Sequence, residues 1–515
     1  MADLKKQPLK PLHGSNLVLL TIAVSFAVFM EVLDLTIVNV SVPHIAGSLA
    51  VSPQEGTWAI SSYALASAIM QPLSGWLARR FGEVRTFVIS LLMFVAFSIL
   101  CGLATSMPML VLFRLLQGAG SGPMVALSLS LLLNSYPTER KGVALAMWAM
   151  TVVIAPIFGP ILGGWLTDNY SWPWIFFINV PVGLLAGIIV MTIMRGREMP
   201  TLRQPIDYIG LMLLVLGVGC LQFMLDNGND KDWFSSPMIV TLGVISLVSL
   251  VFLVAWELTD RHPIVDLSLF KSRNFTVGVI ALSLGMLAFF GINVVFPLWL
   301  QLNLNYTATW AGLATAPVGI LAFLLSPIIG RNIDKMDLRA TVTFSFIIFA
   351  GTSYWFSLFN NQVAFGTLVW PRVVMGLAIP CFFIPLNQMV LSGLSGNQVA
   401  SASGLANFFR TMASSVSTAL TVTLWQHRGE YHHAVLAESV NHASQAASNY
   451  VNTVQSAAPD SQTAWAMIDR VVTQEALTLS VNDVFWGCAV LFLALIPILW
   501  FAKPPFGSSN PEMMH

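Results

Sequence analysis

The chain has 515 residues, of which 56% are hydrophobic and only 9% are charged. A soluble domain carries about 25% charged residues, because polar side chains must cover its surface. The composition therefore excludes an ordinary soluble enzyme, a disordered protein and a disulfide-rich secreted domain, and it predicts a polytopic membrane protein. Basic and acidic residues balance at 24 each, and no basic face or tail indicates a nucleic-acid partner. The four cysteines stand alone in apolar stretches, so we expect no metal or redox site.

Fourteen apolar stretches are long enough to cross a bilayer as helices, which requires roughly 17–25 residues each. The first is not a signal peptide, because it is too long and carries two carboxylates, Glu31 and Asp34. In chain order the expected spans are Asn16–Val42, Gly56–Leu77, Thr86–Ala104, Met109–Leu133, Gly142–Leu166, Trp174–Met194, Ile209–Leu225, Met238–Leu258, Phe275–Leu300, Trp310–Gly330, Thr341–Asn360, Gly366–Leu391, Ser403–Gln426 and Asn482–Phe501.

The distribution of Lys and Arg predicts the orientation of these spans, because cytoplasmic connections carry an excess of both. With the N-terminus inside, the outer connections hold only Lys231, Arg428 and Arg470 of the 24 basic residues. An even number of spans returns the chain to the same side. We therefore expect both termini in the cytoplasm.

Two segments of the first half recur in the second half, which indicates an internal repeat. The stretch 71–80 resembles 326–335, with Pro and Gly at matching places, and the stretch 113–118 resembles 371–376. We therefore predict two six-helix bundles with two extra helices inserted between them. The expected units are residues 1–200, the inserted pair 201–265, and 266–515 with a periplasmic loop at 427–480.

Several longer motifs carry a resemblance to a known family. They are Leu33–Pro43, Gly75–Arg85, Arg114–Gly118, Ala155–Gly164, Trp174–Pro181 and Trp500–Phe506. Together they resemble the fourteen-span drug:proton antiporters of the major facilitator superfamily, and within them the EmrB-type multidrug efflux pumps. The similarity extends over nearly the whole chain.

This resemblance implies proton-coupled export of hydrophobic or amphipathic toxic compounds, and hence antibiotic resistance, across a bacterial inner membrane. It implies no cofactor, because the proton gradient drives transport. It also implies a periplasmic adaptor protein of EmrA type and an outer-membrane channel of TolC type. Export of amphipathic anions such as fatty acids or bile salts is an alternative, and a non-transporting sensor or scaffold is another. No Walker sequence and no nucleophile–His–acid cluster is present, so we expect neither direct ATP use nor an enzyme.

Ionisable residues inside a span are costly, at about 2.5–3.5 kcal/mol each by insertion scales, and they mark functional sites. Glu31 and Asp34 are three residues apart and share one helix face. We hypothesise that Asp34 carries the coupling proton and that Glu31 interacts with it or binds a cation. The alternative is a structural Asp34 bonded to Asn39 or to a neighbouring helix. The resemblance implies that Arg114 takes part in proton transfer, and the alternative is an arginine that fixes its helix.

Two further arginines lie within spans. Arg372 corresponds to Arg114 in the repeat but lies near the outer end of its span, where we expect its side chain to extend to the interface. Arg410 lies beside Asn407, and structural and anion-facing roles both remain open for it. We expect substrate contacts from a mostly apolar cavity between the bundles. The candidates are Asn39, Gln71, Met150, Phe290, Asn293, Phe296, Asn387, Gln388, Asn407 and Arg410.

Small residues and prolines predict close helix packing and gating. One group of these residues surrounds the connection between spans two and three. There Arg79 stands where the family usually has an acidic residue. Asp334 retains the acid at the corresponding connection of the second half. The expected gating and packing residues are Gly75, Arg79, Gly82, Arg85, Pro156, Gly159, Pro160, Gly163, Gly164 and Asp334. The outer segment 427–480 contains four histidines without tight metal-ligand spacing, and it is expected to be a solvated loop with short amphipathic helices.

Overall fold

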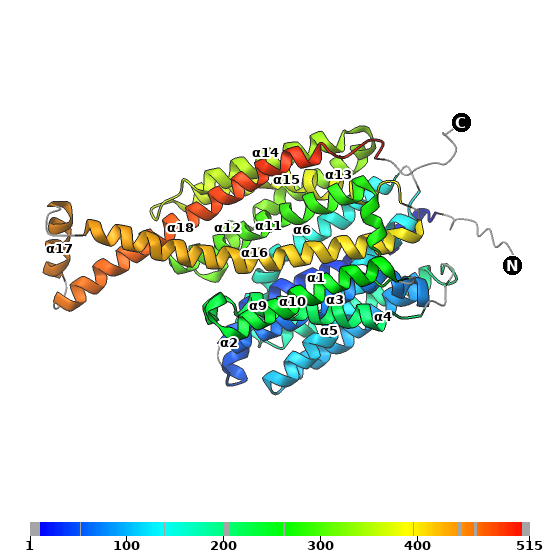
Figure 1. Cartoon of the computed structure of the whole chain (residues 1–515), viewed down its shortest axis with the longest axis horizontal. Coiled ribbons are helices and arrows are strands. Elements are labelled where there is room, and N and C mark those ends of the chain that lie inside the picture. The colour runs from blue at the N-terminus through cyan, green and yellow to red at the C-terminus, as the bar shows by residue number, and fades with distance from the viewer. Residues whose placement is uncertain are drawn as a thin grey trace.

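The computed structural model describes residues 11–51, 53–137, 140–198, 201, 205–260, 263–394, 396–440, 445–457 and 461–506. Every long regular element in these residues is an α-helix, and none of them forms a strand. This confirms the all-α fold predicted from the composition. The helices run side by side along the long axis of the molecule (Figure 1). A helix satisfies its backbone groups within one segment, as a membrane span requires.

The N-terminal bundle begins with a 35-residue helix that is apolar on all sides, as expected for a helix surrounded by other helices and lipid. Prolines lie inside several of its helices, among them Pro72 in α3 and Pro123 in α5. Membrane bundles tolerate them because neighbouring groups satisfy the freed carbonyls. The helices are α1 (Gly14–Ser48), α2 (Pro53–Gly56), α3 (Trp58–Phe81), α4 (Glu83–Gly102), α5 (Met107–Ser135), α6 (Lys141–Asn169), α7 (Trp174–Phe177) and α8 (Asn179–Ile193).

The C-terminal bundle repeats this arrangement. Its second span is divided into two helices at Ala316–Pro317, because proline lacks the amide that would continue the helical hydrogen bonds. The helices are α11 (Arg273–Leu302), α12 (Ala308–Thr315), α13 (Val318–Asn332), α14 (Leu338–Phe356), α15 (Phe365–Leu391), α16 (Gly396–Ser439), α17 (Gln445–Ala457) and α18 (Ser461–Leu499). Short 3-10 turns lie at Asn229–Lys231, Trp233–Ser235, Leu267–Lys271 and Ile333–Lys335.

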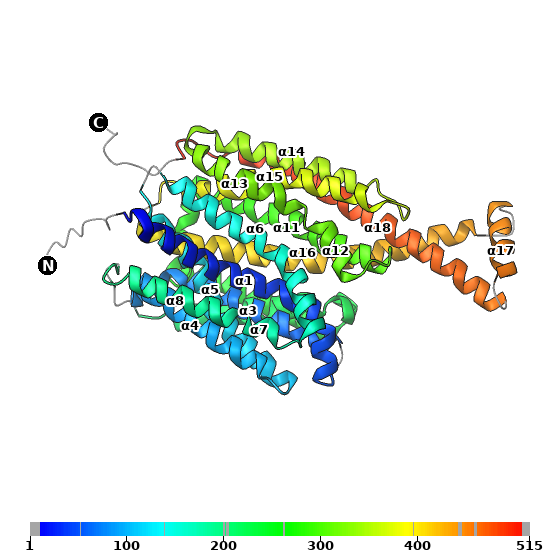
Figure 2. The same cartoon turned by 180° about the vertical axis from the view of Figure 1, so that it is seen from behind.

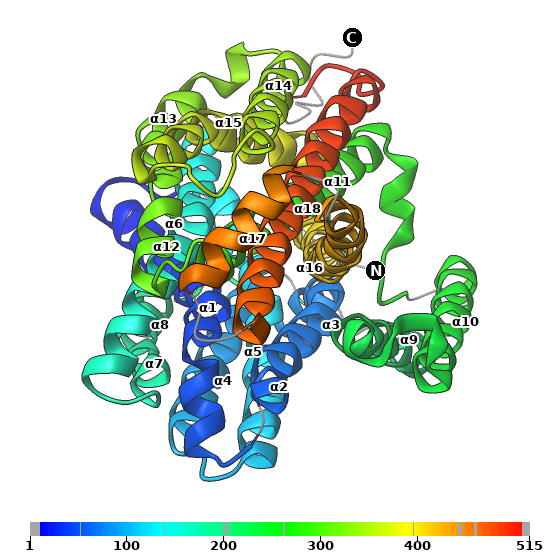
Figure 3. The same cartoon turned by 90° about the vertical axis from the view of Figure 1, so that its left-hand side faces the viewer.

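The two inserted helices, α9 (Tyr208–Asn227) and α10 (Pro237–Thr259), pack on each other and lie beside α3 and α16. Figure 3 looks along the helices and places this pair at the side of the molecule. Asp207 caps α9 by accepting hydrogen bonds from the amides of Ile209 and Gly210. The pair therefore borders both bundles without entering either core.

Ten helical segments in the described part of the chain are long and apolar enough to cross a membrane, by length and composition. The other four expected spans fall on α3, α6, α14 and α16. Each of the fourteen spans predicted from the sequence thus corresponds to helical structure.

The bundles meet closely at the end of the molecule where α1 begins and α18 ends, which we call the terminal end (Figure 2). A methyl group at Gly142 of α6 would overlap the main-chain oxygen of Gly330 on α13. On the other side of the interface, a methyl group at Gly75 of α3 would overlap Ser401 of α16. Glycine is required at these positions because the two backbones are in contact. The terminal end is therefore closed.

The segment 427–480 is not the solvated loop that the sequence predicts. Residues up to Ser439 continue α16, and Ser461 already begins α18, so both helices project beyond the rest of the molecule. The short helix α17 joins their tips (Figure 1). We call 427–480 the helical extension. Helix α18 carries the apolar residues of this segment that recur at helical spacing in the sequence, Trp465, Ile468, Val471 and Val472.

Polar contacts hold the two arms of the extension together near its base. Arg428 of α16 pairs with Asp483 of α18, with Nη2 and Oδ2 2.7 Å apart, and His432 Nε2 lies 2.8 Å from the same oxygen. Further out, His433 Nε2 lies 3.0 Å from Asp469 Oδ1. We call these five residues the clasp. Two of the expected loop histidines therefore contact carboxylates of the facing arm.

Candidate functional site

Asp34 and Arg114 form an ion pair in the middle of the N-terminal bundle. Arg114 Nη1 donates to Asp34 Oδ2, and neither side chain is exposed. Asp34 lies on α1 and Arg114 on α5, so the pair joins two helices that are far apart in the sequence. Breaking one partner of such a buried pair leaves the other charge uncompensated, at a cost of about 3–5 kcal/mol. The pair consequently stabilises the packing of α1 against α5.

Further groups surround the pair. Asn179 Nδ2 donates to Asp34 Oδ1 at 3.1 Å, and Gln117 Oε1 accepts from Arg114 Nη1 at 2.8 Å. Arg114 Nε donates to the main-chain oxygen of Ala59 on α3 at 2.7 Å, and its guanidinium lies 4.2 Å from the ring centroid of Tyr63. The pair thus joins α1, α3, α5 and the start of α8.

Glu31 is buried on α1 but does not share the pairing of Asp34. The charge of Arg410, on α16 of the opposite bundle, acts on it. Arg410 is also nearly buried, with its guanidinium 5.7 Å from the ring centroid of Trp148 on α6. Asp34 therefore faces the inside of its bundle, and Glu31 faces the interface between bundles.

Several of the predicted cavity and gating residues meet at the same interface. Thr411 of α16 donates to Gln71 of α3 at 3.1 Å, and Arg79 Nη1 donates to Ser401 at 2.7 Å. A methyl group at Gly404 would overlap the main-chain oxygen of Gln71. Asn407, on α16, is buried, Met150 on α6 is half-buried, and Asn39 near the end of α1 is exposed. The structure places Asp34 beside Asn179 rather than beside Asn39.

Other predicted residues lie inside the C-terminal bundle or at its terminal end. Arg372 is fully buried, so its side chain does not extend to the interface as the sequence predicts. Phe296 packs against its guanidinium and Asn293 accepts a hydrogen bond from it. Phe290 contacts its neighbour Phe289. Asn387 donates to its own helix, and Gln388 donates to Asp334 at 3.0 Å near the terminal end.

The remaining gating residues pack within the N-terminal bundle. Gly82 has a φ of 97°, which favours glycine, and lies against Glu198, whose Oε1 accepts from the Arg85 amide at 3.3 Å. Gly159 and Gly163 lie against Thr36 and Ile37 of α1, while Gly164 is half-buried. The side chains of Pro156 and Pro160 lie outside the described residues.

The contacts of Gly159 and Gly163 are made within one bundle, as expected for close helix packing. They hold the late part of α6 against α1, the helix that carries Asp34. The start of α6, at Gly142, approaches the opposite bundle at Gly330.

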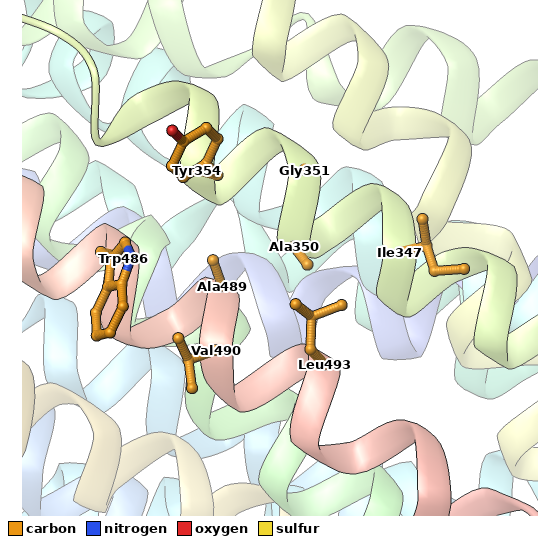
Figure 4. Close-up of a pocket in the computed structure, with 8 residues that line it drawn as sticks. All are labelled: Ile347, Ala350, Gly351, Tyr354, Trp486, Ala489, Val490 and Leu493. Atoms are coloured by element: carbon orange, nitrogen blue, oxygen red, sulfur yellow. The ribbon is translucent and has the colours of Figure 1, made fainter.

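A shallow depression of about 320 Å³ lies between α14 and α18 (Figure 4). Its eight lining residues include the exposed side chains Tyr354, Trp486 and Leu493. No predicted cavity residue lines it. Because its walls are apolar and face outward, we interpret it as part of the lipid-facing surface.

Sequence reasoning did not single out Asn179, Gln117 and Trp148, which complete the site. Asn179 and Gln117 are polar residues within apolar stretches, and this is the signal that could have identified them. Trp148 carries no such signal, because a tryptophan in a span is ordinary. No group of three or more metal-ligating side chains occurs among the residues that the structure describes.

The fold, the buried ion pair and the closed bundle interface can be compared with known proteins. The sequence model of the Major Facilitator Superfamily matches residues 24–418. The chain belongs to this superfamily. Among solved structures, the human organic anion transporter MFSD10 (TETRAN) is similar in fold, with a TM-score of 0.61 over 95% of this chain and 100% of that one at 11% identity.

Within the Major Facilitator Superfamily the chain belongs with the EmrB proteins. It is 51% identical to the multidrug export protein EmrB of Haemophilus influenzae, over 98% of this chain and 99% of the relative. It is 50% identical to EmrB of Escherichia coli K12 over the same shares. It is also 47% identical to the fatty acid resistance protein FarB of Neisseria gonorrhoeae, over 97% and 99%. The chain is therefore a multi-pass membrane transporter.

Proposed function

We propose that the protein exports hydrophobic and amphipathic toxic compounds in exchange for protons, as a multidrug efflux pump. The observation that supports this most is the fully buried Asp34–Arg114 pair. A carboxylate inside a membrane bundle can hold one proton, and its paired arginine changes partners when it does. Each transported proton then has a defined place and a defined structural consequence.

Protonation of Asp34 removes the negative charge that Arg114 faces. Arg114 lies on α5, where it also donates to Gln117 of the same helix, and it donates across to the main-chain oxygen of Ala59 on α3. Loss of the ion pair therefore changes the contacts among three helices of the N-terminal bundle, α1, α3 and α5. Two of them, α3 and α5, contact α16 of the opposite bundle, which gives protonation a route to the bundle interface.

We propose that substrates bind at the interface near Glu31, Gln71 and Arg410. The opposite charges of Glu31 and Arg410 come from different bundles, so each is available to a ligand when the bundles separate. Glu31 suits lipophilic cations, and Arg410 suits amphipathic anions. Export of fatty acids is a second candidate function, because the name of the FarB relative refers to fatty acid resistance.

The remaining features support an assembly in a bacterial inner membrane with both termini in the cytoplasm. The helical extension then lies on the periplasmic side, where it offers a docking surface for an adaptor of EmrA type leading to a channel of TolC type. A pull-down of the adaptor with and without residues 427–480 tests this part of the proposal.

The test of transport uses everted membrane vesicles that carry the wild-type protein or Asp34→Asn. A panel of lipophilic cations, uncouplers and fatty acids is added, and proton movement is recorded with a pH-sensitive dye. We expect substrate-dependent proton movement with the wild type and none with Asp34→Asn. Asp483→Asn, an exposed carboxylate of the clasp, is the matched control and should retain the signal. Proton exchange that survives in Asp34→Asn would place the carrier elsewhere.

A further inference from the structure

The C-terminal bundle contains a buried arginine without a counter-charge. Arg372 has no exposed surface, and none of the ion pairs found among the described residues involves it. Its Nη1 donates to Asn293 Oδ1 at 3.0 Å and lies 3.8 Å from the Met375 sulfur. The rings of Phe296 and Phe356 lie 4.2 and 5.2 Å from the guanidinium carbon. A charged group in this environment is costly unless it is compensated.

The two nitrogens that lack partners are Nε and Nη2. Their N–H bonds lie in the guanidinium plane along one edge, the edge with which arginine binds carboxylates and other anions in bidentate fashion. The aromatic rings cover the faces of the group but do not accept hydrogen bonds along this edge. The unoccupied donors therefore have the geometry of an anion site.

Comparison with the N-terminal bundle shows which charge is missing. Arg114 is the eighth residue of α5, and Arg372 is the eighth residue of α15. Asp34 is the twenty-first residue of α1, and Asn293 is the twenty-first of α11. The repeat thus places an amide where the first bundle has the carboxylate. An amide hydrogen-bonds Arg372 but supplies no negative charge.

We propose that Arg372 and Asn293 form a buried binding site for a small monovalent anion in the C-terminal bundle. The ligand takes the place of the carboxylate that the first bundle supplies from Asp34, and Nε and Nη2 donate to it. Full burial of Arg372 and its two unpaired donors favour a small inorganic anion such as chloride. The carboxylate of an amphipathic compound offers the same chemistry.

The test measures thermal unfolding of the purified full-length protein in detergent. Potassium chloride replaces potassium gluconate at constant ionic strength, and a parallel series adds decanoate. Gluconate is too large and too strongly hydrated to enter an enclosed site. We expect chloride to raise the melting temperature of the wild type by about 2–4 °C in a saturable way, because a ligand that binds only the folded state stabilises it.

The decisive variant is Asn293→Asp, which supplies the missing negative charge from the chain itself. Its melting temperature should be insensitive to chloride. Arg372→Lys should weaken the response, because lysine lacks the two-nitrogen edge. Asn332→Asp is the matched control, because it makes the same change in the same bundle at an exposed residue whose side chain bonds only its own helix, and it should keep the wild-type response.

The anion series decides the source of the ligand. Stabilisation by chloride assigns the site to a free inorganic ion, and stabilisation by decanoate alone assigns it to a carboxylate headgroup. A wild type that responds to neither anion overturns the proposal. An equal response in the wild type and in Asn293→Asp also overturns it, because the anion then binds elsewhere.

Discussion

Asp34 accepts hydrogen bonds from two other residues besides Arg114, and both are amides. Asn179 Nδ2 lies 3.1 Å and Gln117 Nε2 lies 3.4 Å from Asp34 Oδ1. Amide donors stabilise the ionised carboxylate without carrying charge of their own. They therefore hold the carboxylate in place, while Arg114 supplies the opposite charge. Asn179 is a positioning residue in this arrangement, also bonded to Ser98.

We expect Asn179→Ala to change the pH profile of proton-driven transport in everted vesicles, because it removes one of the hydrogen bonds that Asp34 accepts. Asn169→Ala is the control, because Asn169 is exposed and bonds only its own helix. An unchanged pH profile in Asn179→Ala, with normal expression, contradicts the role assigned to it.

A carboxylate outside the spans gives a pH dependence with a defined sign. Burial raises the pKa of Glu198 above its ordinary value, and the backbone amide and charge of Arg85 oppose this only partly. The folded protein therefore binds a proton at this site more readily than the unfolded chain does. Stability rises as the pH falls through the window between the unfolded and the folded pKa.

We expect the melting temperature of the wild type to rise slightly on acidification from neutral pH through this window, and the rise to be smaller in Glu198→Gln. The difference should be tenths of a kcal/mol, because the group is about half exposed and water screens it. Thermal unfolding across a pH series measures it. A larger rise in Glu198→Gln than in the wild type would falsify this assignment.

The cost of a charge inside a span made Asp34 and Arg114 predictable from the sequence, because few residues in the chain carry that cost. The partners of the pair were harder to predict, because an uncharged amide such as Asn179 costs less inside a span than a charge does and therefore gives a weaker signal. Arg372 was misplaced for a related reason. Its position along the span gives its depth, whereas its burial depends on Phe296 and Phe356, which come from other helices.

At the scale of elements, helix ends were less predictable than helices. The apolar part of α16 ends near Gln426, and a span predicted from hydropathy ends there too. The helix nevertheless continues to Ser439, because helix propagation needs only compatible residues and a packing partner. The facing arm of α18 provides that partner. The extension therefore depends on a pairing between segments that are separate in the sequence.

The clasp should determine how firmly the two arms of the extension are held together. We expect Asp483→Asn to loosen them, because Asp483 contacts both Arg428 and His432. Limited trypsin digestion should then cleave the extension several times faster, while the membrane part stays intact. Asp337→Asn is the control, because its partner Arg339 lies on another part of the molecule. Equal digestion rates for Asp483→Asn and the wild type exclude the clasp as a restraint on the arms.

At the scale of the whole molecule, the terminal end is closed by two separate contacts, α6 against α13 and α3 against α16. The sequence repeat predicted two bundles of matching construction, but it could not predict which end is closed. Which end is closed depends on the relative positions of the two bundles. These positions must change during transport, although the sequence stays the same. Only the glycines in backbone contact reveal the state of the structure.

We expect Gly142→Leu to oppose closure of the terminal end, because the larger side chain has no room against Gly330. A reporter is Ser401→Cys, at a buried position in the second contact. Its labelling by a membrane-impermeant maleimide from the terminal side should increase severalfold when Gly142→Leu is added. Gly351→Leu is the control, because nothing lies near a side chain there. Unchanged labelling with Gly142→Leu would mean that the two contacts do not open together.

The length of α16 links events at the terminal end to the tip of the extension. Its 44 residues correspond to about 66 Å, roughly twice the hydrocarbon thickness of a bilayer. Its first turns lie against α3, and its last turns lie beyond the rest of the molecule (Figure 1). If the helix tilts as a rigid rod about its inner end, a rotation of about 10° moves the tip by roughly 10 Å. With such a tilt the extension acts as a lever arm, and a protein seated on its tip would be displaced once in every transport cycle.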